Sequence, residues 1–209
     1  MKPDNILLDS AGHAHITDFN VAIHYSERRL HTSVAGSMAY MAPQVVAKTG
    51  YSWQIDWWSL GITAYELMFH KRPFDGRSAE KMTQSILKDP FRVPVDASKR
   101  CSEEGLMALK GVCHFPAFPD YKTHYLQFIE RDPATRLGCR PNGQGIEDIR
   151  RHPWFSSIDW DAIENKEAQP PFIPDVGFSQ VSLTWPRNSQ AVPDRGKRIL
   201  MCHTKLTNS

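Results

Sequence analysis

The segment from Trp53 to His70 constrains the fold more than any other part of the sequence. It is apolar almost all round, and a helix without a polar face belongs inside a domain rather than on its surface. We expect this helix to end at Lys71-Arg72-Pro73, because proline cannot continue the helical hydrogen bonds. A chain of 209 residues can bury such a helix within one large domain or two small ones.

The composition argues against several classes of protein. The formal net charge is only +2, so no strong positive field favours nucleic acid or an anionic membrane surface. The longest apolar stretch, residues 57–69, is shorter than the roughly 20 residues that span a bilayer. The N-terminus lacks a charged region followed by an apolar run, so no secretory signal is predicted. We therefore expect no nucleic-acid partner and no transmembrane segment, with the cytoplasm as the default location.

The cysteines show neither a metal-binding spacing nor a disulfide framework. Free thiols in a reducing compartment are the expected state. The residues are Cys101, Cys113, Cys139 and Cys202.

The remaining pattern predicts a mainly helical protein with little sheet. Two short strands, residues 6–9 and 15–17, flank a turn at Ser10-Ala11-Gly12. Ser78 and Ser102 are expected N-caps of helices over 79–88 and 103–111. Further expected segments are an exposed loop over 21–37, a helix over 146–152, and an irregular tail beyond Pro170.

The helix that begins after Ser102 is interrupted by VCHFPAFPDYKTHYLQ, residues 112–127, whose prolines forbid a helix. Without these 16 residues, one helical stripe is restored, made of Leu106, Leu109, Phe128 and Ile129. A valine codon begins with GT and a glutamine codon can be CAG, the two ends expected of an intron. We therefore expect residues 112–127 to be a non-native insert translated from an intron; a genuine surface insertion is the alternative.

Five short motifs occur in a highly specific order. They are Lys2-Pro3-Asp4-Asn5, Asp18-Phe19-Asn20, Ala42-Pro43-Gln44, Asp56-Trp57-Trp58-Ser59-Leu60-Gly61, and Arg136. In this order they resemble the C-terminal lobe of a eukaryotic serine/threonine protein kinase. Tyr40-Met41-Ala42-Pro43, the Asp-Phe-Asn motif and residues 132–138 look most like the YANK-type kinases of the AGC group. The resemblance covers residues 1–175, apart from the suspected insert.

The resemblance implies a mainly α kinase-domain fragment with one or two short β hairpins near its N-terminus. The partial kinase domain would span residues 1–175, and 176–209 would form an irregular or disordered tail. The implied reaction is ATP-dependent phosphoryl transfer to serine or threonine of a protein substrate. Asp18 and Asn5 would hold Mg²⁺ and through it the nucleotide, and Lys2 would neutralise charge on the transferred phosphoryl group. Taken singly, Lys2 is a solvated lysine and Asn5 a turn former; the order of the motifs favours the site.

Other matching residues have regulatory or structural roles by resemblance. Ser33 occupies the activation-loop phosphorylation position, although an ordinary exposed loop serine is an equal alternative. Ser37 would contact the region of the substrate hydroxyl. Asp56 would be a buried carboxylate that accepts backbone amides of the catalytic loop; taken alone, it would be a helix N-cap.

Two residues depart from the family pattern. Asn20 replaces the glycine of Asp-Phe-Gly, and asparagine tolerates the left-handed backbone better than most residues. Gln44 replaces the glutamate that pairs with the arginine matching Arg136. Glutamine can hydrogen-bond that guanidinium but leaves a buried charge uncompensated, and breaking such a pair typically costs about 3–5 kcal/mol.

The family places its catalytic aspartate immediately before the position of Met1, and the nucleotide-binding lobe before that. We therefore expect this chain to be an N-terminally truncated fragment that is inactive alone. The alternatives are a non-enzymatic, kinase-derived interaction module and a faulty gene model without a cellular role. An apolar surface normally covered by the other lobe would favour self-association.

Overall fold

The computed structural model describes residues 1–25, 29–110, 127–141, 144–174 and 181–182. The chain forms two compact units. One contains residues 1–2 and 21–156, and the other contains residues 3–20 and the chain from residue 157 onward. The observed elements are mainly helical, which agrees with the fold class predicted from the sequence.

The second unit holds a small antiparallel sheet. Its strands β1 (Ile6–Leu8), β2 (Ala14–Ile16) and β3 (Val181–Ser182) lie in the order β2-β1-β3. The register pairs Leu7 with His15 on one side and with Ser182 on the other. The predicted hairpin is therefore confirmed, within a residue or two at the strand ends.

The structure corrects two sequence expectations in this unit. The tail predicted to be irregular beyond Pro170 contains β3, which pairs with an edge of β1 that periodicity could not reveal. Helix α6 (Trp160–Glu164) was also not predicted, because five residues are too few to show a helical period. Its N-cap is Asp159, whose Oδ1 accepts a hydrogen bond from Ala162 N at 3.0 Å.

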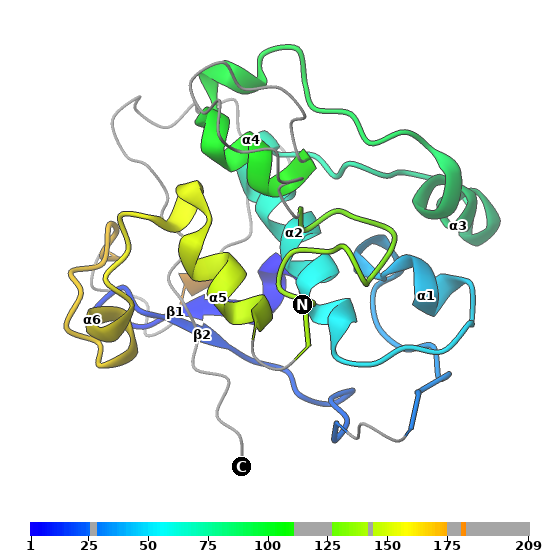
Figure 1. Cartoon of the computed structure of the whole chain (residues 1–209), viewed down its shortest axis with the longest axis horizontal. Helices are drawn as coiled ribbons and strands as arrows, with labels where there is room; N and C mark the ends of the chain where they lie inside the picture. The colour runs from blue at the N-terminus through cyan, green and yellow to red at the C-terminus, as the bar shows by residue number, and fades with distance from the viewer. Residues whose placement is uncertain (26–28, 111–126, 142–143, 175–180, 183–209) are drawn as a thin grey trace. The chain divides into compact units, whose positions relative to one another are not determined.

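The first unit is built around the apolar helix. Helix α2 (Gln54–Phe69) buries Trp58, Ile62 and Ala64 completely. It ends at Phe69, and its C-cap His70 adopts a left-handed conformation (φ 56°), so the helix stops before Pro73 is reached. In Figure 1, α2 is cyan and runs beside the green helix α4 (Glu103–Lys110), with which it is in contact.

Serine caps begin two of the surrounding helices, as predicted. Ser78 Oγ accepts a hydrogen bond from Lys81 N at 3.2 Å and starts α3 (Ala79–Lys88). Ser102 Oγ accepts one from Gly105 N at 3.3 Å and starts α4. Helix α5 (Gln144–Arg151) begins two residues before the predicted start at Ile146, and the short helix α1 (Pro43–Val46) was not predicted.

The two cysteines that the structure describes are free thiols, as expected. Burial raises the pKa of Cys101 to about 11 and that of Cys139 to about 12, so both resist conversion to the reactive thiolate. Cys113 and Cys202 lie outside the described residues. No helix in the described part of the chain is long and apolar enough to cross a membrane.

The core is continuous across the suspected insert. Phe128 N donates to Ala108 O at 2.9 Å. If residues 112–127 are removed, Phe128 takes position 112, four residues after Ala108, and this contact becomes an ordinary helical hydrogen bond. Leu109, Phe128 and Ile129 are buried as the restored stripe requires, whereas Leu106 is only half-buried. Residues 112–126 themselves lie outside the described residues.

We predict that deletion of residues 112–127 leaves the protein folded and at least as stable. Closing a loop of this length costs about 2–3 kcal/mol, and the deletion removes that cost. The carbonyl of Gln127 accepts a hydrogen bond from Leu137 N at 3.0 Å, and in the variant the residue that then precedes Phe128 would supply this carbonyl. Urea unfolding checks this, with Phe128→Ala as a matched control that should cost about 3–5 kcal/mol in both backgrounds. A deletion variant that fails to unfold cooperatively would show that the segment belongs to the fold.

His152 introduces a pH dependence into the same core. Its side chain is 3% exposed, and its Nδ1 accepts a hydrogen bond from Trp154 N at 3.2 Å. Burial lowers the pKa of His152 from 6.5 to about 4, and Glu104 opposes this shift. Between about pH 4 and pH 6.5, the imidazole is therefore neutral in the folded protein but protonated in the unfolded chain.

We predict that the free energy of unfolding falls as the pH is lowered from about 6.5 to about 4. Only the unfolded chain gains the proton in this window, so the loss reaches about 3 kcal/mol. His152→Asn keeps a capping acceptor but does not titrate, and should flatten this part of the profile. The exposed His24→Asn variant should retain the dependence; equal profiles for the wild type and His152→Asn would refute the assignment.

Candidate functional site

The β1–β2 hairpin brings Asn5 and Asp18 together. Beyond the strands, Thr17 N and Thr17 Oγ1 both donate to Asn5 O, at 2.9 and 3.3 Å. The residue that follows Thr17 therefore lies beside Asn5. Asn5 Nδ2 donates to Asp18 Oδ2 at 3.4 Å. Two side chains that are 13 positions apart in the sequence are thus within reach of one small ligand.

The left-handed residue of the Asp-Phe-Asn motif is Asp18, with φ 62°. From the sequence, a left-handed backbone was expected at Asn20, which stands where the resembling motif has glycine. Asn20 does not adopt a positive φ, so the left-handed tolerance invoked there is not needed. Aspartate tolerates this region better than most residues, and such conformations cluster at functional sites.

Asp9 fixes the turn that holds this hairpin. Its Oδ1 accepts hydrogen bonds from Ala11 N at 3.0 Å and from His13 N at 2.9 Å, and its Oδ2 lies 2.9 Å from His15 Nε2. The contact with His15 is the main reason that the pKa of Asp9 falls to about 2. Asp9 was not predicted as a site residue from the sequence, although an aspartate before a Ser-Ala-Gly turn is a common turn signal.

The Asn5–Asp18 pair fits a hard divalent cation in part. Carboxylate and amide oxygens are the ligands that Mg²⁺ prefers, and Mg²⁺ usually keeps several waters besides one or two protein ligands. Asp18 is exposed and Asn5 half-buried, which leaves room for waters or a phosphate. In the described part of the chain, no three His, Cys, Asp or Glu residues form a closed metal cluster. Lys2 is half-buried and belongs to the other compact unit.

Arg136 is completely buried and satisfied by oxygens from several segments. Nε donates to Glu130 O at 2.8 Å, Nη1 to Gln54 O at 2.9 Å, and Nη2 to Arg131 O at 3.2 Å. Nη2 also donates to Gln44 Oε1 at 3.4 Å. The guanidinium carbon lies 5.3 Å from the centre of the Trp58 ring, a cation–π distance.

These contacts qualify the expectation of an uncompensated charge. Burial lowers the pKa of Arg136, while Cys139, Glu130 and Asp132 oppose the shift. Three backbone carbonyls accept from the guanidinium in addition to the Gln44 amide. The guanidinium therefore has hydrogen-bond partners, but position 44 supplies a neutral amide and not a carboxylate.

Asp56 is exposed on the first turn of α2, not buried as expected. Reduced hydration by nearby protein atoms raises the pKa of the Asp56 carboxyl, and the Met1 ammonium group opposes this rise. The same ammonium donates to Ser59 Oγ at 3.1 Å, and Ser59 Oγ donates to Asp56 O at 2.9 Å.

Ser33 is exposed but tethered to Tyr51. The two hydroxyl oxygens lie 3.2 Å apart, and Tyr51 OH donates to Ser33 O at 2.8 Å. Reciprocal backbone hydrogen bonds of 2.9 Å join His31 and Tyr51. Sequence reasoning missed Tyr51, because no local pattern connects it with a loop 18 residues away. Ser37 is exposed, without a side-chain capping bond to the short helix that follows.

Comparisons with known proteins agree with the motif order. The protein kinase domain family matches residues 1–155. A serine/threonine-protein kinase of Arabidopsis thaliana, AtPK2/AtPK19, is 37% identical over 180 residues, which are 86% of this chain and 33% of the relative. Ribosomal protein S6 kinase alpha-6 of Danio rerio is 35% identical, covering 85% of this chain and 21% of the relative. Protein kinase C zeta type of Oryctolagus cuniculus is 35% identical, covering 84% and 28%. The chain thus spans a third or less of the length of these relatives.

We predict that Gln44→Glu stabilises the protein, because it gives the buried Arg136 a half-buried counter-ion at an existing contact. The expected gain in the free energy of unfolding at pH 7 is about 1–3 kcal/mol. Gln44→Met keeps the side-chain volume but removes the acceptor, and should lower stability instead. Urea unfolding of the three proteins checks this order. A glutamate variant less stable than the wild type would mean that desolvation of the carboxylate outweighs the pairing.

Proposed function

This chain belongs to the serine/threonine protein kinase family, and we propose that it supplies the C-terminal lobe of such an enzyme. The proposed reaction is transfer of a phosphoryl group from ATP to serine or threonine of a protein substrate. The relatives are AGC-type kinases, and the Tyr40-Met41-Ala42-Pro43 and Asp-Phe-Asn segments support the YANK-type subgroup. The partial domain would span residues 1–175, with 112–127 as a non-native insert and 176–209 as a tail.

The juxtaposition of Asn5 and Asp18 is the observation that carries this proposal. Bound Mg²⁺ would neutralise charge on the nucleotide phosphates and orient them. In this chain, the Asp18 carboxylate and the Asn5 amide oxygen would hold the cation, with the amide turned from its present contact. Lys2 would supply a positive charge to the phosphoryl group being transferred. The left-handed backbone at Asp18 presents the carboxylate beside Asn5.

We further propose that the 209 residues alone transfer no phosphate. The aspartate that accepts the substrate proton and the lobe that clamps the nucleotide are not among them. Positioning accounts for much of the rate of such reactions, so the metal-holding residues alone should not suffice. The arginine that the family uses to bind a phosphate at the position of Ser33 is likewise not among the 209 residues. A phosphate on Ser33 would therefore lack this partner.

A second candidate function is a non-enzymatic interaction module. Four apolar side chains among the described residues 21–25 and 29–30 are 51–62% exposed: Val21, Ile23, Tyr25 and Leu30. Apolar side chains gathered on one exposed segment favour contact with a partner or with a second copy. Retention of all three residues Lys2, Asn5 and Asp18 favours the kinase proposal, because a pure interaction module has no need of them.

We predict that Mn²⁺, used as a paramagnetic probe, broadens the amide NMR signals around Asn5 and Asp18 first. Asp18→Ala should weaken this binding at least about tenfold, the equivalent of 1.4 kcal/mol. Asp161→Asn, an exposed carboxylate change on α6, is the matched control and should leave binding unchanged. Broadening centred elsewhere, or unaffected by Asp18→Ala, would remove the metal site from the proposal.

A further inference from the structure

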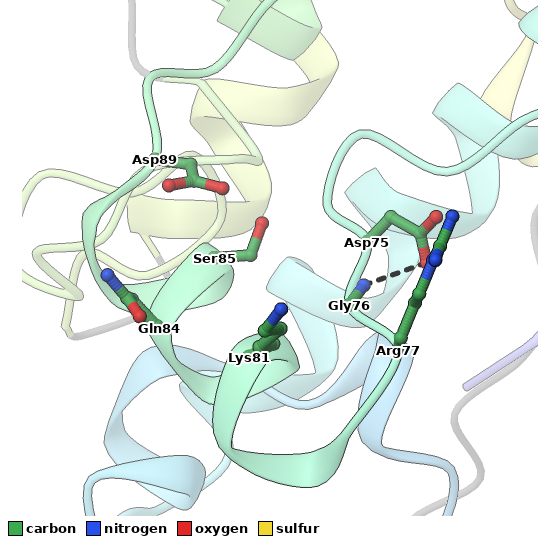
Figure 2. A pocket seen from close by; sticks show the side chains of 7 residues that line it. All are labelled: Asp75, Gly76, Arg77, Lys81, Gln84, Ser85 and Asp89. Carbon is green, nitrogen blue, oxygen red and sulfur yellow. Dashed lines mark hydrogen bonds between the residues drawn. The ribbon is translucent and has the colours of Figure 1, made fainter.

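A polar cavity lies between helix α3 and the loop that precedes it. The cavity has a volume of about 370 Å³ and is lined by residues 75–77 together with Lys81, Gln84, Ser85 and Asp89. Figure 2 shows these side chains around the space between the loop and the helix. This volume is at the small end of the range for ligand pockets, and the lining is polar or charged apart from Gly76.

The cavity is held open by buried anchors. Met82 and Ile86 lie in the core and fix α3, and Arg131 Nε donates to Ile86 O at 2.8 Å. The loop touches the helix backbone at Gly76, where an added Cβ would lie 2.3 Å from Met82 N. Only glycine therefore allows the loop to approach α3 so closely. The two walls are fixed before any ligand binds.

Charges of both signs face this cavity without pairing with one another. Arg77 and Lys81 are positive, and Asp75 and Asp89 are negative. Among the described residues, no ion pair joins any two of these four side chains. Asp75 Oδ1 instead accepts a hydrogen bond from Gly76 N at 2.8 Å, drawn as the dashed line in Figure 2.

Ser85 supplies a second, independent indication of a ligand. Its side chain is 4% exposed, and in the described part of the chain its hydroxyl makes no hydrogen bond. The buried Thr63 in α2 shows the usual alternative, because its Oγ1 donates to Ser59 O at 2.8 Å. In Figure 2 the Ser85 oxygen points into the space between α3 and the loop. The Ser85 residue is buried, but its oxygen reaches the cavity, so the unpaired hydroxyl is available to hydrogen-bond a polar group bound there.

We propose that this cavity binds a zwitterionic group, a carboxylate and an ammonium held close together in space. Lys81, Arg77 and the Ser85 hydroxyl would receive the carboxylate, and Asp89 and Asp75 the ammonium. The four ionic side chains sum to zero charge, so an isolated phosphate or a bare cation would meet repulsion as well as attraction. The group comes either from a free amino acid or from adjacent acidic and basic side chains of a peptide. This inference does not depend on Asn5 or Asp18.

Amide NMR titration of the 209-residue chain tests this proposal with glycine, acetate and methylammonium as probes. Glycine should give saturable shifts in residues 75–89 and bind at least about tenfold more tightly than either single-charge probe. Lys81→Gln, Asp89→Asn and Ser85→Ala should each weaken glycine binding. Lys88→Gln removes a charge from the same helix outside the cavity, and should leave glycine binding unchanged.

A capped dipeptide, acetyl-Lys-Asp-amide, distinguishes the two sources. Binding of glycine alone would assign the site to a free amino acid, and binding of the capped dipeptide alone would assign it to a peptide partner; either supports the shared chemistry. Equal affinity for all three small probes, or glycine binding unaffected by Lys81→Gln and Asp89→Asn, would overturn the proposal. So would the absence of saturable shifts with both glycine and the dipeptide. The metal titration is separate, so either proposal can fail alone.

Discussion

The buried guanidinium of Arg136 is the interaction on which the helical unit depends. It joins the start of α2 through Gln54 O, α1 through the Gln44 amide, and its own loop through Glu130 O and Arg131 O. The charge of the guanidinium is taken out of water there, so each oxygen that accepts a hydrogen bond from it contributes more to stability than it would at the surface. Glutamine at position 44 keeps the geometry but gives up the opposite charge. The guanidinium is therefore held in this chain by hydrogen bonds to uncharged oxygens.

The sequence predicted the elements whose signals are local. The apolar run of α2, the serine caps of α3 and α4, and the turn between β1 and β2 are all signals carried by adjacent residues. Features that depend on distant partners were missed. Strand β3 exists because β1 has an unpaired edge, and Tyr51 reaches Ser33 across the loop. The motif order named Asn5 and Asp18, but only the hairpin register shows that they meet.

The core on the two sides of residues 112–127 is another case in which residues far apart in the sequence are in contact. Phe128 N donates to Ala108 O as though the intervening residues were absent. Phe128 also packs closely against α2, where an added Cβ at Gly61 would lie 2.6 Å from Phe128 Cβ. The helix pattern and the hydrogen bond are separate observations that both place Phe128 one helical turn after Ala108, and the packing against Gly61 shows that Phe128 belongs to the core.

The central claim is that this chain holds the metal-binding part of a kinase site but cannot transfer phosphate by itself. A phosphotransfer assay with radiolabelled ATP and a serine/threonine-containing protein substrate tests it most directly, with the 209-residue chain and its Asp18→Ala variant side by side. The account predicts no incorporation by either protein above the background without protein. Turnover by the chain that Asp18→Ala abolishes would contradict it, because the 209 residues would then contain a complete catalytic site.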